Sequence, residues 1–200
     1  MWDLNIIVLA AIAGLFMIAF AGDIFSLLMP RQIHSSPNGK MFSARSLDII
    51  HSDNAEYWIW AHSNDSRFTE VAELLKVWWL DIKVRIKLNE LLPKTKYTAR
   101  LIFKTVPTSM GLDAFQEASV SMGSLKQKKV VCVSPRVAVP PNVGLPVRRS
   151  DGWMELELGQ FYCDVDNITG DREVVVGLME TDNNNMKTGL IVGGLEVRPI

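Results

Sequence analysis

Residues Leu80–Ile86 read LDIKVRI, and this stretch decides the fold class. Its apolar positions are Leu80, Ile82, Val84 and Ile86, and its polar positions are Asp81, Lys83 and Arg85. Successive side chains of a β-strand point to opposite faces, so this alternation predicts a half-buried strand. The stretch therefore indicates a sheet with one face against a core and the other toward solvent.

Short runs of the same kind continue along the rest of the chain. Further strands are expected at Tyr97–Val106 (which Pro107 follows), Val130–Val133, Trp153–Leu158, Arg172–Met179 and Leu190–Val197. Turn-forming clusters separate them at 139–144 and 182–185, and Gly193-Gly194 indicates a bulge or a close backbone approach. One short helix is expected near Phe68–Leu75, with Thr69 as its cap. The predicted fold class is all-β, an antiparallel β-sandwich or jelly roll with that one short helix.

The composition limits the function classes. The chain has 200 residues and 48% hydrophobic content, enough for the core of one domain. Its net charge of −1 predicts no bulk attraction to nucleic acid, and Lys126, Lys128 and Lys129 are interpreted as a solvated loop. The two cysteines, Cys132 and Cys163, are too few for a disulfide scaffold. Buried free thiols are the favoured interpretation, and a single bridge is the alternative.

The N-terminal segment, residues 1–29, is hydrophobic. Leu4–Gly22 carries no charged residue and approaches the ~20 residues that cross a ~30 Å hydrocarbon core as a helix. An uncleaved membrane anchor is the favoured interpretation, and a signal peptide with a cleavage site near Ala19–Ala21 is the alternative. Basic residues follow the segment, which predicts a domain facing the cytoplasm; secreted or nucleocytoplasmic placements are the alternatives. Residues 30–40 are expected to link this segment to a domain over 41–200.

The sequence offers no catalytic constellation. It contains no nucleophile elbow, phosphate-binding glycine loop or Cys-x-x-Cys pair. Glu155 and Glu157 would share one face of a strand, where two carboxylates could approach a glycosidic bond, but an exposed strand face is the favoured interpretation. His51 and His62 are not at metal-ligand spacing. We therefore expect a protein that is not an enzyme and needs no cofactor or metal.

The segment SARSLDIIHSDNAEYWIW, Ser43–Trp60, concentrates aromatic side chains beside short polar ones. An aromatic ring stacks on the apolar face of a pyranose, and amides and carboxylates orient its hydroxyls, so a sugar-binding surface is one interpretation. Trp58 and Trp60 would share one face of a strand, so packing in the core is the other. Trp78 and Trp79 are adjacent, which in a strand predicts that at least one of them lies in the core.

Segment Ser43–Trp60 resembles the opening motif of the phloem protein 2-like lectins, the plant family that includes the tobacco agglutinin. Further stretches resemble family motifs in the same order: VAELLKVWWLDIKVRI (Val71–Ile86), KTKYTARLIFK (Lys94–Lys104), RSDGWMELELGQF (Arg149–Phe161), REVVVGLMETD (Arg172–Asp182) and KTGLIVGGLEVRP (Lys187–Pro199). These ordered matches extend over the whole region after the expected linker, so the resemblance is specific.

The resemblance implies a β-sandwich lectin that binds N-acetylglucosamine oligomers or N-glycan cores, without catalysis or a required metal. It also implies roles in phloem and in stress or defence responses. In the tobacco-type motif two tryptophans are associated with sugar binding: Trp58 matches the second, and His51 stands at the first. Met186 stands where the family often has another tryptophan. The predicted carbohydrate-binding residues are therefore Trp58 and His51.

The expected partners follow from this resemblance and from the N-terminal segment. They are glycans or glycoproteins that contain N-acetylglucosamine, and a membrane through residues 1–29, with no nucleic acid. A homodimer is compatible with the sequence. The alternative function is a β-sandwich protein-interaction module with a degenerate sugar site, because His51 and Met186 replace aromatic residues of the family pattern.

Overall fold

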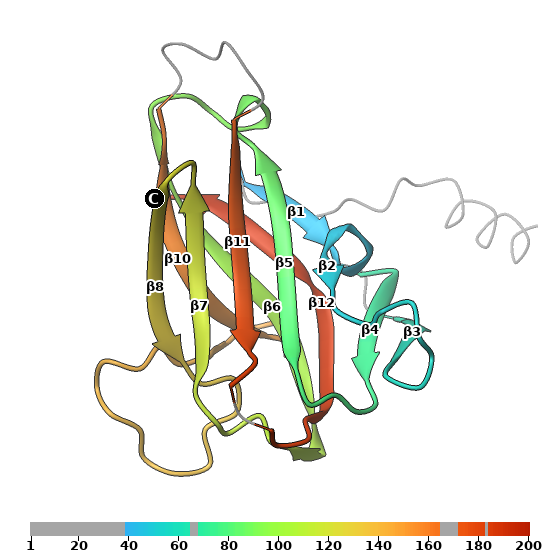
Figure 1. The fold of residues 1–200 in the computed structure, drawn as a ribbon. Helices are drawn as coiled ribbons and strands as arrows, with labels where there is room; N and C mark the ends of the chain where they lie inside the picture. The colour runs from blue at the N-terminus through green and yellow to red at the C-terminus, as the bar shows by residue number, and fades with distance from the viewer. Residues whose placement is uncertain (1–38, 65–67, 165–171, 183) are drawn as a thin grey trace, which may run out of the picture. The chain divides into compact units, whose positions relative to one another are not determined.

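The computed structural model describes residues 39–64, 68–164, 172–182 and 184–200. In these residues the chain forms two antiparallel sheets that face each other (Figure 1). Sheet A is seven-stranded and runs β3 (Trp58–His62), β4 (Glu70–Leu74), β12 (Thr188–Pro199), β6 (Thr95–Met110), β10 (Met154–Cys163) and β9 (Val147–Arg148), with β1 (Lys40–Ser43) also paired to β12. Sheet B is five-stranded and runs β2 (Asp48–Ile49), β5 (Leu80–Lys87), β11 (Glu173–Glu180), β7 (Gln116–Met122) and β8 (Leu125–Val131). Two short 3-10 helices are η1 (Ala44–Ser46) and η2 (Leu88–Glu90). The predicted all-β sandwich is confirmed.

The hydrophobic core lies between the two sheets. On β5 the alternation of the LDIKVRI stretch is confirmed, because its four apolar side chains are buried and its polar ones are more exposed. Sheet A contributes buried residues to the same core cluster, among them Leu101, Phe103, Leu156, Leu158, Leu190 and Leu195. Apolar side chains from both sheets are thereby removed from water, which is the main stabilising contribution to a sandwich of this kind.

The helix expected near Phe68–Leu75 is wrong, because this segment forms strand β4. β4 pairs with β3 on one side and with β12 on the other. Ala72 and Leu74 belong to the main core, whereas Val71 packs into a second hydrophobic cluster. Both faces of the strand are therefore covered, which removes the period-two pattern and leaves a spacing that imitates a helix.

The second hydrophobic cluster explains the glycine pair of β12. Phe68, Val71, Ile102 and Trp153 form this cluster. A Cβ atom on Gly193 would lie 2.8 Å from the Phe68 ring and 2.9 Å from the Trp153 ring. The register of β12 against β6 shifts at the same place. The predicted bulge and close approach at Gly193-Gly194 are confirmed.

Strand β6 is longer than the sequence predicts. It continues through Pro107 to Met110, although proline cannot donate to a strand ladder. The pairing of β6 with β12 joins Thr105 to Leu190 and Met110 to Thr188, with a register shift between these pairs. Pro107 thus lies in an irregular stretch where a ladder hydrogen bond is not required.

The three lysines expected in a loop lie instead on β8, the last strand of sheet B. Lys128 forms an ion pair with Glu117 at 2.7 Å, and Lys129 forms one with Glu157 at 3.2 Å. Lys126 lies 3.9 Å from Glu117. Charged side chains on an edge strand oppose pairing with another chain, so these lysines suit their position.

Cys132 and Cys163 are both free and buried, which confirms the favoured interpretation. Their thiols lie near backbone carbonyls, with Cys132 Sγ 3.5 Å from Asp113 O and Cys163 Sγ 3.6 Å from Leu88 O. Burial raises the pKa of each thiol, because it disfavours the thiolate. Both cysteines therefore act as small apolar side chains of the interior.

The predicted membrane-anchored localisation needs correction. In the part of the chain that the structure describes, no helix is long and apolar enough to cross a bilayer. The expected span Leu4–Gly22, and with it the N-terminal hydrophobic helix, lies outside the described residues. The prediction of a membrane anchor with the domain facing the cytoplasm is therefore withdrawn.

Candidate functional site

The connection between β4 and β5 carries Trp78 and Trp79. β4 ends at Leu74 and β5 begins at Leu80, so neither tryptophan belongs to a strand. The exposed fraction is 43% for Trp78 and 57% for Trp79. The expectation that at least one of them lies in the core was wrong, because it assumed strand geometry at this position.

Backbone hydrogen bonds hold this connection on two sides. The Leu75 amide donates to Tyr57 O at 2.8 Å. Val77 and Lys187 exchange two bonds, with Val77 N donating to Lys187 O at 3.0 Å and Lys187 N donating to Val77 O at 2.7 Å. Val77 itself is buried. The two tryptophans therefore project from a backbone whose path is fixed.

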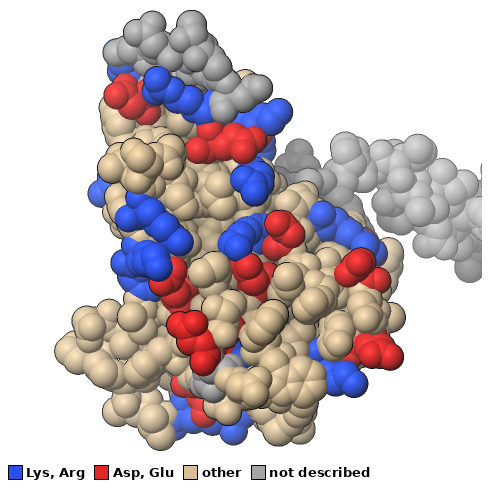
Figure 2. Space-filling model, viewed as in Figure 1, with Lys and Arg blue, Asp and Glu red and all other residues tan. Residues whose placement is uncertain are grey.

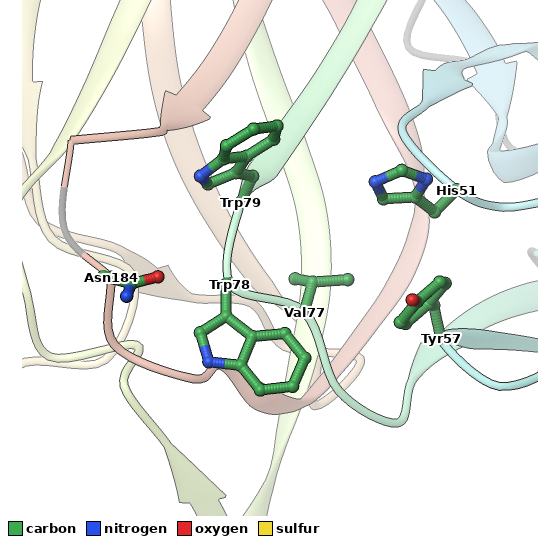
Figure 3. A pocket seen from close by; sticks show the side chains of 6 residues that line it. All are labelled: His51, Tyr57, Val77, Trp78, Trp79 and Asn184. Atoms are coloured by element: carbon green, nitrogen blue, oxygen red, sulfur yellow. The ribbon is translucent and has the colours of Figure 1, made fainter.

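The two indole rings open onto a pocket of about 250 Å³ at one end of the sandwich. Its lining residues are His51, Tyr57, Val77, Trp78, Trp79 and Asn184. Figure 3 shows the two indoles on one side of Val77 and the rings of His51 and Tyr57 on the other. Three connections supply these residues: β2 to β3, β4 to β5, and β11 to β12. We refer to this site as the aromatic pocket.

A compact turn between β2 and β3 places the second pair of rings. His51 has a positive φ of 61°, and the backbone N–H of Asn54 donates to His51 O at 3.1 Å. The Tyr57 amide in turn donates to Asn54 O at 3.0 Å. The centroids of the His51 and Tyr57 rings consequently lie 5.1 Å apart. Trp60 Nε1 donates to Ser52 O at 3.0 Å and ties the turn to β3.

A buried lysine holds two of the pocket connections together. Lys187 is 0% exposed and forms an ion pair with Glu180, which is also buried. Lys187 Nζ donates to Trp78 O at 2.7 Å and to Asn185 O at 2.8 Å. A buried ammonium group is stable only when it is paired and hydrogen-bonded, and these partners meet that need. Lys187 thus fixes the β4–β5 and β11–β12 connections relative to each other.

The structure separates the two residues predicted to bind sugar. His51 is exposed and lines the aromatic pocket. Trp58 is 1% exposed and belongs to the main core. A sugar ring needs an open aromatic face, so the stacking role predicted for Trp58 does not fit its position. Sequence reasoning missed Trp78 and Trp79 as site residues, although their adjacency just before a clear strand was a usable signal.

The two carboxylates considered for glycosidic chemistry are engaged in ion pairs. Glu155 is buried and contacts Arg100, Arg149 and Arg198. Burial opposes ionisation of Glu155, but these guanidinium groups lower its pKa below the ordinary value of 4.5. The pKa of Glu157 is also lowered, because burial is outweighed by Lys129 and its other partners. The expected exposed strand face is wrong for Glu155, and neither group has the raised pKa of a general acid.

The aromatic pocket offers rings for stacking and a few polar groups for orientation. Indole and phenol rings bind apolar C–H faces, and the Asn184 amide can both donate and accept hydrogen bonds. Within the described residues no group of three or more His, Cys, Asp or Glu side chains could hold a metal ion. The pocket thus offers rings and polar groups that suit a ligand with an apolar face and a polar edge.

The sequence model of the family described as Phloem protein 2 matches residues 38–199. The chain belongs to this family. F-box protein PP2-B10 of Arabidopsis thaliana is 38% identical over 162 residues, which cover 80% of this chain and 59% of the relative. Putative F-box protein PP2-B12 of Arabidopsis thaliana is 38% identical over 159 residues, which cover 80% of this chain and 60% of the relative. This Phloem protein 2 chain therefore matches about three-fifths of the length of these relatives.

The fold is also similar to that of solved carbohydrate-binding modules. One is the CBM27-1 module of Caldicellulosiruptor saccharolyticus in complex with mannohexaose, at 12% identity and a TM-score of 0.41. The overlap covers 82% of this chain and 99% of that module.

Proposed function

We propose that this chain is a carbohydrate-binding module that recognises N-acetylglucosamine oligomers or N-glycan cores at the aromatic pocket. The observation that supports the proposal is the pair of half-exposed indoles, Trp78 and Trp79, opposite His51 and Tyr57 in a pocket of about 250 Å³. Membership of the Phloem protein 2 family supports it independently, because the family resemblance implies a lectin. Binding is non-covalent, and no bond of the sugar is broken.

The energetics of stacking set the expected affinity. Covering about 100 Å² of apolar area contributes roughly 2–3 kcal/mol. The indole of Trp79 is the more exposed of the two and offers the larger free face. Part of the gain is offset by the ordering of the ligand, so a single sugar ring is expected to bind with a Kd of roughly 1 mM.

The polar groups of the pocket account for orientation rather than for most of the affinity. The Tyr57 hydroxyl and the Asn184 amide can each donate and accept a hydrogen bond. An acetamido group carries one N–H and one C=O, which such groups can pair. We therefore assign stacking to Trp78 and Trp79, and orientation of the hydroxyl and acetamido groups to His51, Tyr57 and Asn184.

Titration calorimetry of the full chain with the N-acetylglucosamine tetramer tests this function. The expected result is saturable binding that weakens about tenfold or more in Trp79→Ala, the equivalent of at least ~1.4 kcal/mol. Tyr162→Ala is the matched control, because Tyr162 is also an exposed aromatic residue and lies outside the aromatic pocket. Absence of binding, or equal binding by the folded Trp79→Ala variant, would contradict the proposal.

A second function is supported by exposed apolar side chains on the same connections. Leu75 follows β4, and Met186 precedes the buried Lys187; both are exposed. Together with the two indoles they would suit a protein partner, as in an interaction module with a degenerate sugar site. A glycan array distinguishes the two functions. Binding to N-acetylglucosamine glycans that is lost in Trp79→Ala favours the lectin, whereas binding to a partner that persists after enzymatic removal of its glycans favours the interaction module.

A further inference from the structure

A second aromatic residue lies on the same end of sheet B as Trp79. Phe115 directly precedes β7, just as Trp79 directly precedes β5, and β11 runs between these two strands. Asp81, Met179 and Glu117 are cross-strand partners in the row nearest this end on the outer face. Figure 1 shows the three strands reaching the same end of the sandwich.

Phe115 and Trp79 occupy equivalent positions relative to the row of Asp81, Met179 and Glu117. Trp79 is two residues before Asp81, and Phe115 is two residues before Glu117. Phe115 lines a groove together with Glu117 and Met179 of that row, which places its ring on the outer side of sheet B. Two inter-strand spacings separate β5 from β7, which corresponds to roughly 10 Å. Rings two units apart in a short oligosaccharide are separated by a distance of this order.

Phe115 is 50% exposed and borders two shallow grooves. Their volumes are about 160 Å³ and about 280 Å³, and Glu117 and Asp182 line both of them. Asp182 belongs to the β11–β12 connection, which also supplies Asn184 to the aromatic pocket. The grooves and the aromatic pocket therefore both border the β11–β12 connection.

The polar surroundings of Phe115 suit a sugar better than an apolar peptide. Glu117 and Asp182 offer carboxylate acceptors, and Lys128 beside Glu117 offers an ammonium donor. Figure 2 shows acidic and basic side chains interspersed over the visible face of the molecule. Such a surface favours neither sign of charge on a ligand, and its donors and acceptors can pair with hydroxyl groups.

We propose that Phe115 forms a second aromatic subsite, which binds a further ring of an oligosaccharide whose first ring stacks on Trp79. This inference rests on the proposed function of the aromatic pocket and extends it to ligand length. The second subsite makes the chain select oligomers over single sugars. A ring stacked on Phe115 adds affinity for the longer ligand and leaves the affinity for the monosaccharide unchanged.

Titration of the full chain with N-acetylglucosamine, its dimer and its tetramer tests this proposal. The parent is expected to bind the tetramer at least about tenfold more tightly than the monosaccharide. Phe115→Ala is expected to remove most of this gain while its monosaccharide affinity stays within about twofold of the parent. Trp79→Ala weakens every ligand, and Tyr162→Ala serves as the control that changes none.

The outcomes separate the two proposals. If Phe115→Ala keeps the full gain with ligand length, the second subsite is wrong and the aromatic pocket stands. If the parent binds none of the three ligands, both proposals are wrong. Circular dichroism checks the fold of each variant. Asp182→Ala, at an exposed position of the same grooves, provides a second variant that is expected to show a smaller loss with the same dependence on ligand length.

Discussion

Two pairs of tryptophans in this molecule have opposite surroundings. Trp58 and Trp60 lie on β3, where Trp58 is 1% exposed and Trp60 is partly buried. Trp78 and Trp79 lie between β4 and β5, where both indoles are about half exposed. Both pairs lie in segments that resemble family motifs, but only the second pair lines the aromatic pocket.

The difference shows that strand position decides what a tryptophan can do. Within a sheet, alternation sends every second side chain into the core, and Trp58 follows that rule. Outside a strand the rule does not hold, so two adjacent indoles can both reach solvent. In the motif around Trp58, the tryptophan itself therefore serves the core, whereas His51 and Tyr57 of the same motif line the aromatic pocket with Trp78 and Trp79.

The largest expected effect is on the free energy of unfolding, which should differ between a tryptophan of the buried pair and one of the exposed pair. Trp58→Ala removes a fully buried indole from the core and should lower the free energy of unfolding by about 4 kcal/mol. Trp79→Ala removes a half-exposed ring and should change it by less than about 1 kcal/mol. Urea unfolding measures both values. Equal losses in the two variants would contradict the assignment of Trp58 to the core.

The next largest effect concerns the buried ion pair between Lys187 and Glu180. Lys187 also donates a hydrogen bond to the backbone carbonyl of Trp78. Lys187→Met leaves the Glu180 carboxylate buried without its cation and should cost about 3 kcal/mol of unfolding free energy. The double variant Lys187→Met with Glu180→Gln should recover part of that loss, because no charge then remains buried. Urea unfolding of the single and double variants measures this coupling. A single variant as stable as the parent would show that Lys187 does not hold the two connections.

Part of this picture could be predicted from the sequence. The alternation at Leu80–Ile86 predicts β5 correctly, and the Gly193-Gly194 pair predicts the bulge of β12. These signals succeed because each depends on local backbone geometry. The family match likewise depends on ordered local motifs.

Other features could not be predicted, because they depend on contacts distant in sequence. β4 imitates a helix since the main core buries one of its faces and the cluster around Phe68 covers the other. The aromatic pocket unites three connections, and only the folded sandwich brings them to one end. The exposure of Trp78 and Trp79 depends on where β4 ends and β5 begins. The alternation of apolar and polar residues locates the middle of a strand better than its ends.

The smallest expected effect concerns the ion pairs that Glu155 of β10 forms with Arg100, Arg149 and Arg198. The pKa of Glu155 is lowered in the folded chain, so its stabilising contribution is present above the ordinary value of 4.5 and is lost as pH falls through the lowered value. Glu155→Gln should cost about 2 kcal/mol at pH 7, and the difference from the parent should shrink in acid.

Thermal or urea unfolding of this variant across acidic pH measures the effect. Glu56→Gln is the control, because Glu56 is exposed, and it should stay within about 0.5 kcal/mol of the parent at every pH. A Glu155→Gln deficit that grows in acid would show that the arginines do not stabilise the ionised form.

A tryptophan-fluorescence titration with the N-acetylglucosamine tetramer tests the central claim most directly. Trp58→Phe and Trp79→Phe form a matched pair of variants; Trp58 Nε1 has no hydrogen-bond partner among the described residues, so phenylalanine removes no bond there. The account predicts that Trp58→Phe keeps the saturable emission change and a Kd within about twofold of the parent, whereas Trp79→Phe loses most of the emission change. Loss of the change in Trp58→Phe, with full retention in Trp79→Phe, would contradict the account.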